Sequence, residues 1–215
     1  MECVRWSRLL GEFETSNQQE RKRMLLGVAL GMLHANAVEW LTHKYVLHGL
    51  GRKKGSLFRF HWAQHHRIAR KNAMYDKSYE APFWSYSNRG KEILGIAGLA
   101  LLHLPLLKVA PYFTAAVLFS SGNYLYRHRK AHVDVEWGKK HMPHHWDHHM
   151  GANQDANWCV SYPWFDWILG TRVRSTEASK SPVPSALPRE EAGSSLLAAL
   201  RGQKRGAALR HVRRV

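Results

Sequence analysis

Histidine is the residue type most able to do chemistry in this 215-residue chain, because its copies gather in three patches. Twelve of the fifteen histidines belong to these patches. Imidazole is a frequent ligand of transition metals and titrates near neutral pH. The patches contain His43, His48, His61, His65 and His66, then His128 and His132, and finally His141, His144, His145, His148 and His149. Such grouping indicates a metal centre rather than histidines scattered over a basic surface.

The spacing within the patches suits ligands carried on helices. Residues three or four apart share one face of a helix and can aim at one point. Three sets have this spacing: His61 with His65, His128 with His132, and His145 with both His148 and His149. His43 and His48 are five apart, about 140° round an ideal α-helix, so we expect them to serve different metals or to straddle a helix end.

The type of ligand limits which metals the site can bind. The two cysteines, Cys3 and Cys159, lie far apart in the chain, which excludes a thiolate site of the CxxC type. Almost no carboxylates accompany the histidines, so imidazole is the main ligand type. Imidazole favours iron, zinc, copper and nickel over magnesium and calcium. The histidines are too many for one ion, which predicts a dinuclear site. This reasoning alone does not select redox chemistry.

Two apolar tracts must position these patches. Residues 24–41 are rich in Leu, Val and Ala but contain three polar residues, which predicts a membrane helix whose polar groups face protein or a cavity. A buried helix of a soluble bundle is the alternative. Residues 92–126 are too many for one span of about twenty residues, and Pro105 and Pro111 interrupt them. We therefore expect a hairpin of two short helices there.

The hairpin determines whether the patches can share metals. A single crossing by residues 92–126 would leave the first patch on one side of the bilayer and the other two on the opposite side. Two crossings, or a shallow re-entrant hairpin, put every patch on one face, in agreement with the basic residues that flank each patch. The expected fold is all-α, with integral membrane helical hairpins and a histidine-rich helical cap that encloses a dinuclear metal site.

The charge of the chain points to an acidic neighbour, since 32 Lys and Arg oppose 16 Asp and Glu. A nucleic-acid-binding module would leave the apolar tracts unexplained, so we expect anionic lipid and no nucleic acid. Residues 52–91 combine ten basic side chains with aromatic residues, as at a membrane interface. We divide the chain into a polar segment (1–20) without a secretory signal, a membrane-associated domain (21–171) and a basic, disordered tail (172–215). A short amphipathic helix over 194–215 is the alternative for the end of the tail.

The order of these features resembles the fatty acid hydroxylase and sterol desaturase superfamily. The order is HX4H, HX3HH, apolar hairpin, HX3H and HX2HH, closed by NWCVSYPWFDWILGT at residues 157–171. The resemblance covers residues 41–171. It implies an integral membrane, mainly helical protein with a cytoplasm-facing histidine cap over two iron ions. The second histidine box is one residue longer than the HX2HH often found in the family, and the chain has fewer apolar residues than the usual four-helix anchor.

Carried over position by position, the resemblance implies ten metal ligands. They are His43, His48, His61, His65, His66, His128, His132, His145, His148 and His149. His141 and His144 are surplus, but with His145 they repeat the HX2HH spacing and could replace a ligand. His34 and His103 lie inside apolar tracts and are expected to be buried, hydrogen-bonded residues. Candidates for orienting the ligand rings are Asp147, Asp155 and Asp166, and the alternative for each is a helix cap or a surface charge.

The resemblance also implies a reaction. An oxidoreductase of this family uses O₂ to hydroxylate or desaturate an unactivated C–H bond of a fatty acyl, sterol or related lipid. The chain has no GxGxxG fingerprint, haem-attachment motif or iron–sulfur spacing, so electrons are expected from a separate reductase, ferredoxin or cytochrome. Residues 52–91 could dock such an acidic donor or simply meet lipid head groups. The alternative function is a zinc-dependent membrane hydrolase or a metal-binding membrane protein without redox turnover, and zinc could also substitute for iron in purified protein.

Overall fold

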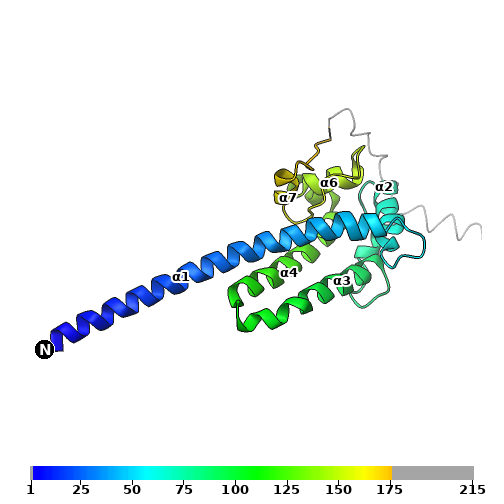
Figure 1. Ribbon diagram of the computed structural model, residues 1–215. Helices are drawn as coiled ribbons and strands as arrows, with labels where there is room; N and C mark the ends of the chain where they lie inside the picture. Colours follow the sequence, from blue (N-terminus) through cyan, green and yellow to red (C-terminus); the bar gives the residue numbers. More distant parts are fainter. Residues whose placement is uncertain (1, 176–215) are drawn as a thin grey trace, which may run out of the picture. The chain divides into compact units, whose positions relative to one another are not determined.

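The computed structural model describes residues 2–175, with side chains from residue 14, and all regular structure within that range is helical. Three longer helices, α1 (Glu2–Leu41), α3 (Asn88–His103) and α4 (Pro111–Val133), run alongside one another (Figure 1). The expected all-α fold is confirmed. Residues 176–215, which hold most of the predicted tail and its alternative helix, lie outside the described residues.

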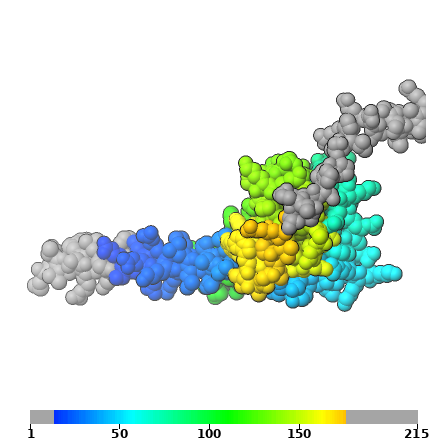
Figure 2. Space-filling view, turned by 90° about the horizontal axis from the view of Figure 1, so that it is seen from above, coloured from blue at the N-terminus to red at the C-terminus, as the bar shows by residue number. Residues whose placement is uncertain are grey.

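Shorter helices gather at the end of the three long ones, and we refer to them together as the cap (Figures 1 and 2). The cap consists of η1 (Thr42–Leu50), η2 (Phe60–His66), α2 (Arg67–Lys71), η3 (Lys77–Tyr79), α5 (Val135–His141), α6 (Pro143–Met150) and α7 (Trp164–Ile168). Asp134 ends α4 and caps α5 by accepting a hydrogen bond from the backbone N–H of Trp137 (3.2 Å). This turn folds α5 and α6 back, so the three histidine patches meet in the cap.

The predicted hairpin is confirmed, with α3 and α4 joined by the short 3₁₀ helix η4 (Leu104–Lys108). Ser87 caps α3, because its hydroxyl accepts a hydrogen bond from the backbone N–H of Gly90 (3.2 Å). Pro105 and Pro111 lie in the first turns of η4 and α4, where the missing N–H of proline is tolerated. The hairpin returns the chain to the cap, as the shared metal site requires.

Two glycines allow α1 to lie close to α4. A Cβ atom on Gly31 would lie 2.5 Å from the carbonyl oxygen of Phe113, and one on Gly27 would lie 2.9 Å from the Cβ of Tyr112. The two glycines are four residues apart and therefore occupy one face of α1. Small residues at this spacing permit close helix packing in membranes. The contact fixes α4, whose far end carries the second histidine patch, against α1.

Two stretches, Glu14–Leu50 and Asn88–Lys108, are long and apolar enough to cross a membrane. Only 17% of the most apolar window of the first stretch is buried, and 0% of that of the second. Apolar side chains such as Leu94 and Leu102 therefore face outward instead of filling a core. Exposed apolar surface of this kind marks a site of interaction with a membrane or with another protein. The helices support membrane association and oppose the alternative of a buried helix in a soluble bundle.

Candidate metal centre

Nine of the ten predicted ligands form two buried groups, and within each group the candidate ligand atoms lie within 4.8 Å of one another. The first group contains His43, His48, His61, His66 and His148. The second contains His65, His128, His132 and His149. His145, the tenth predicted ligand, adjoins the second group, with its Nε2 3.1 Å from the Nε2 of His132. The structure thus brings together side chains from all three patches.

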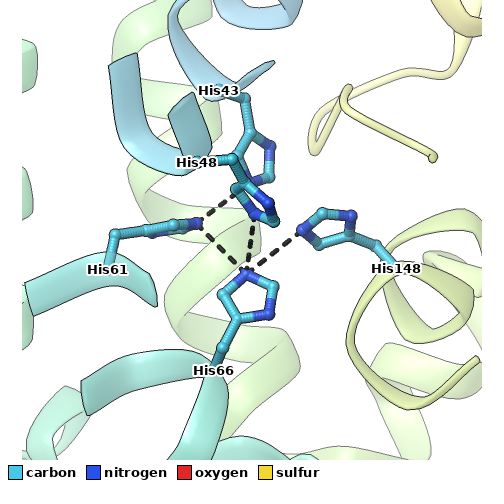
Figure 3. A group of neighbouring side chains, drawn as sticks. All are labelled: His43, His48, His61, His66 and His148. Atoms are coloured by element: carbon cyan, nitrogen blue, oxygen red, sulfur yellow. Dashed lines mark hydrogen bonds between the residues drawn. The ribbon is translucent and has the colours of Figure 1, made fainter. Parts of the chain in front are cut away.

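The first group converges on His66 (Figure 3). Its Nε2 lies 3.1 Å from the Nε2 of His48 and 3.2 Å from the Nε2 atoms of His61 and His148. The Nε2 of His43 lies 3.0 Å from that of His61. One ring proton on His66 can satisfy only one of its three neighbours, so hydrogen bonds alone do not account for this convergence.

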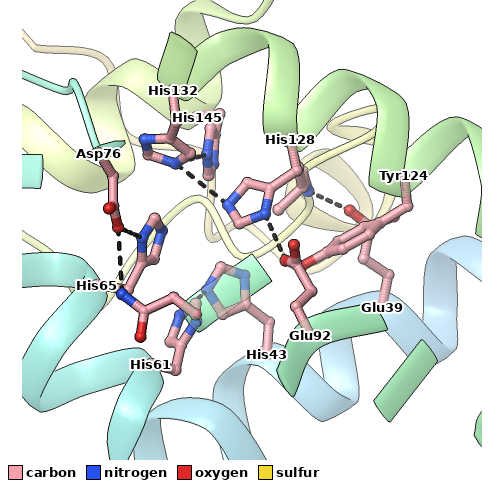
Figure 4. Close-up of polar contacts among 12 residues, drawn as sticks. Glu39, His43, His61, His65, Asp76, Glu92, Tyr124, His128, His132 and His145 are labelled. Carbon is pink, nitrogen blue, oxygen red and sulfur yellow. Dashed lines mark hydrogen bonds and ion pairs between the residues drawn. The ribbon is translucent and has the colours of Figure 1, made fainter. Parts of the chain in front are cut away.

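The second group surrounds His132 and lies between α4, η2 and α6 (Figure 4). The Nε2 of His132 is 3.2 Å from the Nε2 of His128, and the His65 ring centroid is 4.4 Å from that of His132. The expected sharing of a face by His128 and His132 is confirmed. The ring centroid of His149 is 4.7 Å from that of His132 and completes the group.

The two groups adjoin each other. The ring centroids of His66, in the first group, and His149, in the second, are 4.3 Å apart. His65 and His66 are neighbours in η2, as are His148 and His149 in α6, and each pair contributes one ring to each group. Consecutive helical residues point in directions about 100° apart, so one short helix can serve both groups. The two groups could therefore hold two metal ions side by side.

Three sequence predictions about spacing are wrong. His148 belongs to the first group while His145 adjoins the second, so these two rings do not aim at one point. The other two predictions fail because η1 and η2 are π-helices. In a π-helix the backbone hydrogen bonds join residues five apart, which brings positions i and i+5 together. His43 and His48 both lie within η1 and in the same group, so they neither straddle a helix end nor separate. In η2, His61 joins His66, whereas His65 belongs to the other group.

Hydrogen bonds outside the first group fix the ring protons of two of its members. The Nδ1 of His43 donates to the carbonyl oxygen of Trp158 (2.5 Å), and the Nδ1 of His148 donates to that of Ala156 (2.7 Å). A neutral imidazole with its proton on Nδ1 has a lone pair on Nε2. Both rings therefore point lone pairs into the group.

The same pattern holds in the second group. The Nδ1 of His132 donates to the carbonyl oxygen of Met74 (2.7 Å), and the Nδ1 of His65 donates to the carboxylate of Asp76 (2.9 Å). Their lone pairs therefore lie on Nε2. Such outer acceptors hold metal-ligating histidines in one tautomer and orientation.

The buried nitrogens fit a metal ion. The Nε2 atoms of His65 and His149 are buried and have no hydrogen-bond partner in the described part of the chain. Leaving such a group unsatisfied costs about 1–3 kcal/mol. Burial lowers the pKa of His148 to about 4 and the pKa of His66 well below its usual value, so both rings are neutral at physiological pH. Neutral rings with converging lone pairs are suitable ligands for cations.

Glu92, at the start of α3, supports the second group from outside (Figure 4). Its Oε1 contacts the Nδ1 of His128 and accepts a hydrogen bond from the hydroxyl of Tyr124 (3.0 Å). The Tyr79 ring stacks on that of His132, with centroids 5.2 Å apart. A buried carboxylate and two phenols thus restrict the movement of these ligands.

Asp76 orients His65 and is itself held in place. Its Oδ2 also accepts from the amide of Asn88 (3.3 Å), and its Oδ1 accepts from the backbone N–H of Ser78 (2.9 Å). Burial opposes ionisation of Asp76, but the hydrogen bonds from His65 and Ser78 outweigh it and lower the pKa of this carboxyl below its usual value. The ionised carboxylate makes the Nε2 of His65 a better ligand.

Replacing this carboxylate tests its role. We expect Asp76→Asn to weaken metal binding at the second group by about 10- to 100-fold, the usual loss when an orienting partner is removed. Competition with a chelator of known affinity would measure the change. Glu80→Gln is the matched control, because Glu80 is an exposed carboxylate four residues further along. Equal affinities for Asp76→Asn, Glu80→Gln and the unaltered protein would show that Asp76 does not support the site.

Two carboxylates hold the segment that supplies the carbonyl of Trp158. The backbone N–H groups of residues 158–161 all donate hydrogen bonds to these carboxylates. Asp166 accepts those of residues 158 and 159 (both 2.8 Å). Glu39 accepts those of residues 160 and 161, the second at 2.7 Å. All four amides are thereby satisfied inside the protein. The motif at residues 157–171 thus serves the site, because it fixes the carbonyl group that accepts the hydrogen bond from His43.

The aspartates predicted to orient ligands mostly have other partners. Asp155 alone approaches a candidate ligand, with its carboxylate 3.8 Å from the Nδ1 of His48. Asp147 forms an ion pair with Arg172 (2.8 Å), and Asp166 binds backbone amides as described. For Asp147 and Asp166 the structure therefore does not support the orienting role. Arg172, the first residue of the predicted tail, is part of this structure.

The surplus histidines lie outside both groups. His141 is exposed and stacks on Trp137, with ring centroids 4.9 Å apart. His144 is buried, and its Nε2 donates to the carbonyl oxygen of Val160 (2.8 Å). Because neither residue belongs to a group, the structure does not favour His141 or His144 as a replacement ligand.

Comparison with known proteins agrees with this geometry. The family model for fatty acid hydroxylases matches residues 28–171 of the 215, a range that includes every histidine of both groups. No curated protein and no solved structure matched the chain.

Proposed function

Because this chain belongs to the fatty acid hydroxylase family, we propose that it is an O₂-dependent, di-iron hydroxylase or desaturase of a lipid, bound to a membrane. The observation that carries the proposal is the pair of adjoining buried histidine groups. Imidazole ligands suit iron. An all-imidazole shell is neutral and leaves each ion its full positive charge.

The first group would hold one iron and the second group the other, with His145 beside the second. Two iron ions bound there supply the reduction of O₂ and the oxidising power to break an unactivated C–H bond. The chain contributes geometry: carbonyl and carboxylate acceptors hold each ring in one tautomer, and burial of the rings excludes water.

A cavity beside the first group would receive the lipid. It lies among α1, α3 and α4, and His43 forms part of its wall. Its apolar lining consists of Ala35, Val38, Leu47, Ile96, Leu99 and Val117. An acyl chain, sterol or related hydrocarbon placed there would present a C–H bond to the first group. The largely apolar lining favours a lipid substrate over a water-soluble one.

Electrons would come from an external reductase, ferredoxin or cytochrome that docks on the basic surface next to His48. Arg52, Lys53 and Lys54 are exposed there. The Arg52 guanidinium lies 4.1 Å from the ring centroid of Trp62, whose centroid is 4.9 Å from that of His48. This contact series leads from the surface to the first group. Basic residues flanking the cap favour the cytoplasmic face for it.

Metal analysis combined with oxygen uptake tests the proposal. We expect two iron ions per chain and O₂ consumption that requires a reductant. Lipid extracts from cells with an active copy should contain a species heavier by one oxygen or lighter by two hydrogens. Zinc retained through activity, with no O₂ consumed, would reject the proposal in favour of a hydrolase.

A further inference from the structure

The cavity beside the first group also contains a pair of histidines to which the metal site gives no role. His34 of α1 and His103 of α3 both line it, and their Nε2 atoms are 3.0 Å apart. Both rings are hydrogen-bonded, as expected from the sequence, but they are half-buried and not buried. His34 lies nine residues before His43, about 13 Å along the helix axis. One cavity therefore joins a polar pair to a candidate metal ligand.

The hydrogen bonds of this pair fix the positions of its protons. The Nδ1 of His103 donates to the carbonyl oxygen of Leu99 (2.8 Å), so the Nε2 of His103 carries a lone pair. The N–H that lies between the two rings must therefore belong to the Nε2 of His34. The Nδ1 of His34 is then left with a lone pair, and it has no hydrogen-bond partner in the described part of the chain.

The remaining cavity wall limits what can donate to that nitrogen. Glu39 is the only carboxylate in the lining, and the backbone amides of residues 160 and 161 already bind it. Apart from the histidines, the other polar side chains of the lining are the hydroxyls of Thr42, Ser120, Ser121 and Tyr124, which are uncharged, so a cationic donor would find no free counter-charge there. A ketone or an ether has no proton to give. An uncharged hydroxyl is the common lipid group that satisfies both conditions.

We propose that His34 forms the polar subsite of this cavity and accepts a hydrogen bond from the hydroxyl group of an uncharged lipid alcohol. The carbon presented to the first group then lies about 13 Å from that hydroxyl. His103 positions His34 by holding its proton on Nε2. The inference deepens the proposed function by naming the substrate class, but binding of the alcohol requires no turnover.

Equilibrium binding to the purified, metal-loaded protein under anaerobic conditions tests the subsite. The probes are radiolabelled dodecanol, a dodecanone and dodecane, which share a chain length and differ in the hydrogen-bonding group. We expect the protein to bind the alcohol about fivefold more tightly than the other two, the effect of one neutral hydrogen bond. His34→Phe should bind all three equally, because phenylalanine keeps the ring contact with Phe113 (centroids 5.2 Å) but has no lone pair.

Controls separate this subsite from a purely structural pair. His141→Phe alters an exposed ring away from the cavity and should keep the preference for alcohol, whereas His34→Gln should restore part of it. Equal binding of the three probes to the unaltered protein, or an alcohol preference that survives His34→Phe, would overturn the proposal. If His34→Phe does not fold, the three-probe comparison on the unaltered protein decides alone. Alcohol preference without O₂ uptake would overturn only the proposed function.

Discussion

Replacing His148 with alanine is expected to remove one metal ion and replacing His149 the other, although the two residues are neighbours in α6. His148 belongs to the first group and His149 to the second. Each variant should retain about one ion per chain, because the other group keeps its ligands. The proposed O₂-dependent activity should fall well over 100-fold in both, beyond the loss typical of an orienting residue, since the proposed reaction uses both ions.

Metal content per chain, measured by mass spectrometry, would distinguish the two variants from matched controls. His141→Ala removes an exposed histidine and His144→Ala a buried one, and neither residue belongs to a group. Both controls should keep two ions. Retention of two ions by His148→Ala and His149→Ala would refute the ligand assignment, as would loss of an ion from His141→Ala.

Much of the fold could be predicted because its signals are local. Pro105 and Pro111 lack the N–H that an uninterrupted helix needs, so they mark the ends of two helices whatever the rest of the chain does. His128 and His132 share a face because α4 has ordinary α-helical winding. The prediction that the patches meet followed from the same hairpin.

Pairing of ligands within the first patch was not predictable from α-helical periodicity. At the start of η1 the hydroxyl of Thr42 donates to the carbonyl oxygens of Val38 (2.7 Å) and Glu39 (3.2 Å). Such side-chain bonds compete with the regular backbone pattern where α1 passes into η1. A spacing of five, as between His43 and His48, is the local signal that could have indicated π-helical winding at a functional site.

The orienting carboxylates were missed for a different reason. Asp76 and Glu92 contact ligands that are 11 and 36 residues away in the chain, so no periodic spacing links them. Only the fold brings these pairs together. The sequence contained a weaker signal for their role. Asp76 is one of only two acidic residues in the basic stretch 52–91, and Glu92 lies near the start of an otherwise apolar helix.

Removing both metals is expected to unfold the cap while α1 and α4 stay paired. The buried apolar clusters in the described residues are small, with Met74, Tyr124, Ala131, Met142 and Val160 in one and Trp40, Trp158 and Cys159 in the other. Many of the other buried side chains in the cap are imidazoles whose lone pairs converge. Because metal binding to such a site contributes directly to folding, chelation should lower the Tm by more than about 10 °C.

Limited proteolysis with trypsin would show where structure is lost, since the cap contains many basic residues at which trypsin cleaves. Cleavage should concentrate in residues 52–71 and at Lys139 and Lys140 after chelation and disappear when iron or zinc is restored, because either ion accepts imidazole ligands. The contact of α1 with α4 at Gly27 and Gly31 involves no candidate ligand and should remain protected. A cap that stays resistant without metal would mean that its carbonyl and carboxylate acceptors suffice to hold the rings, and that the ions serve chemistry alone.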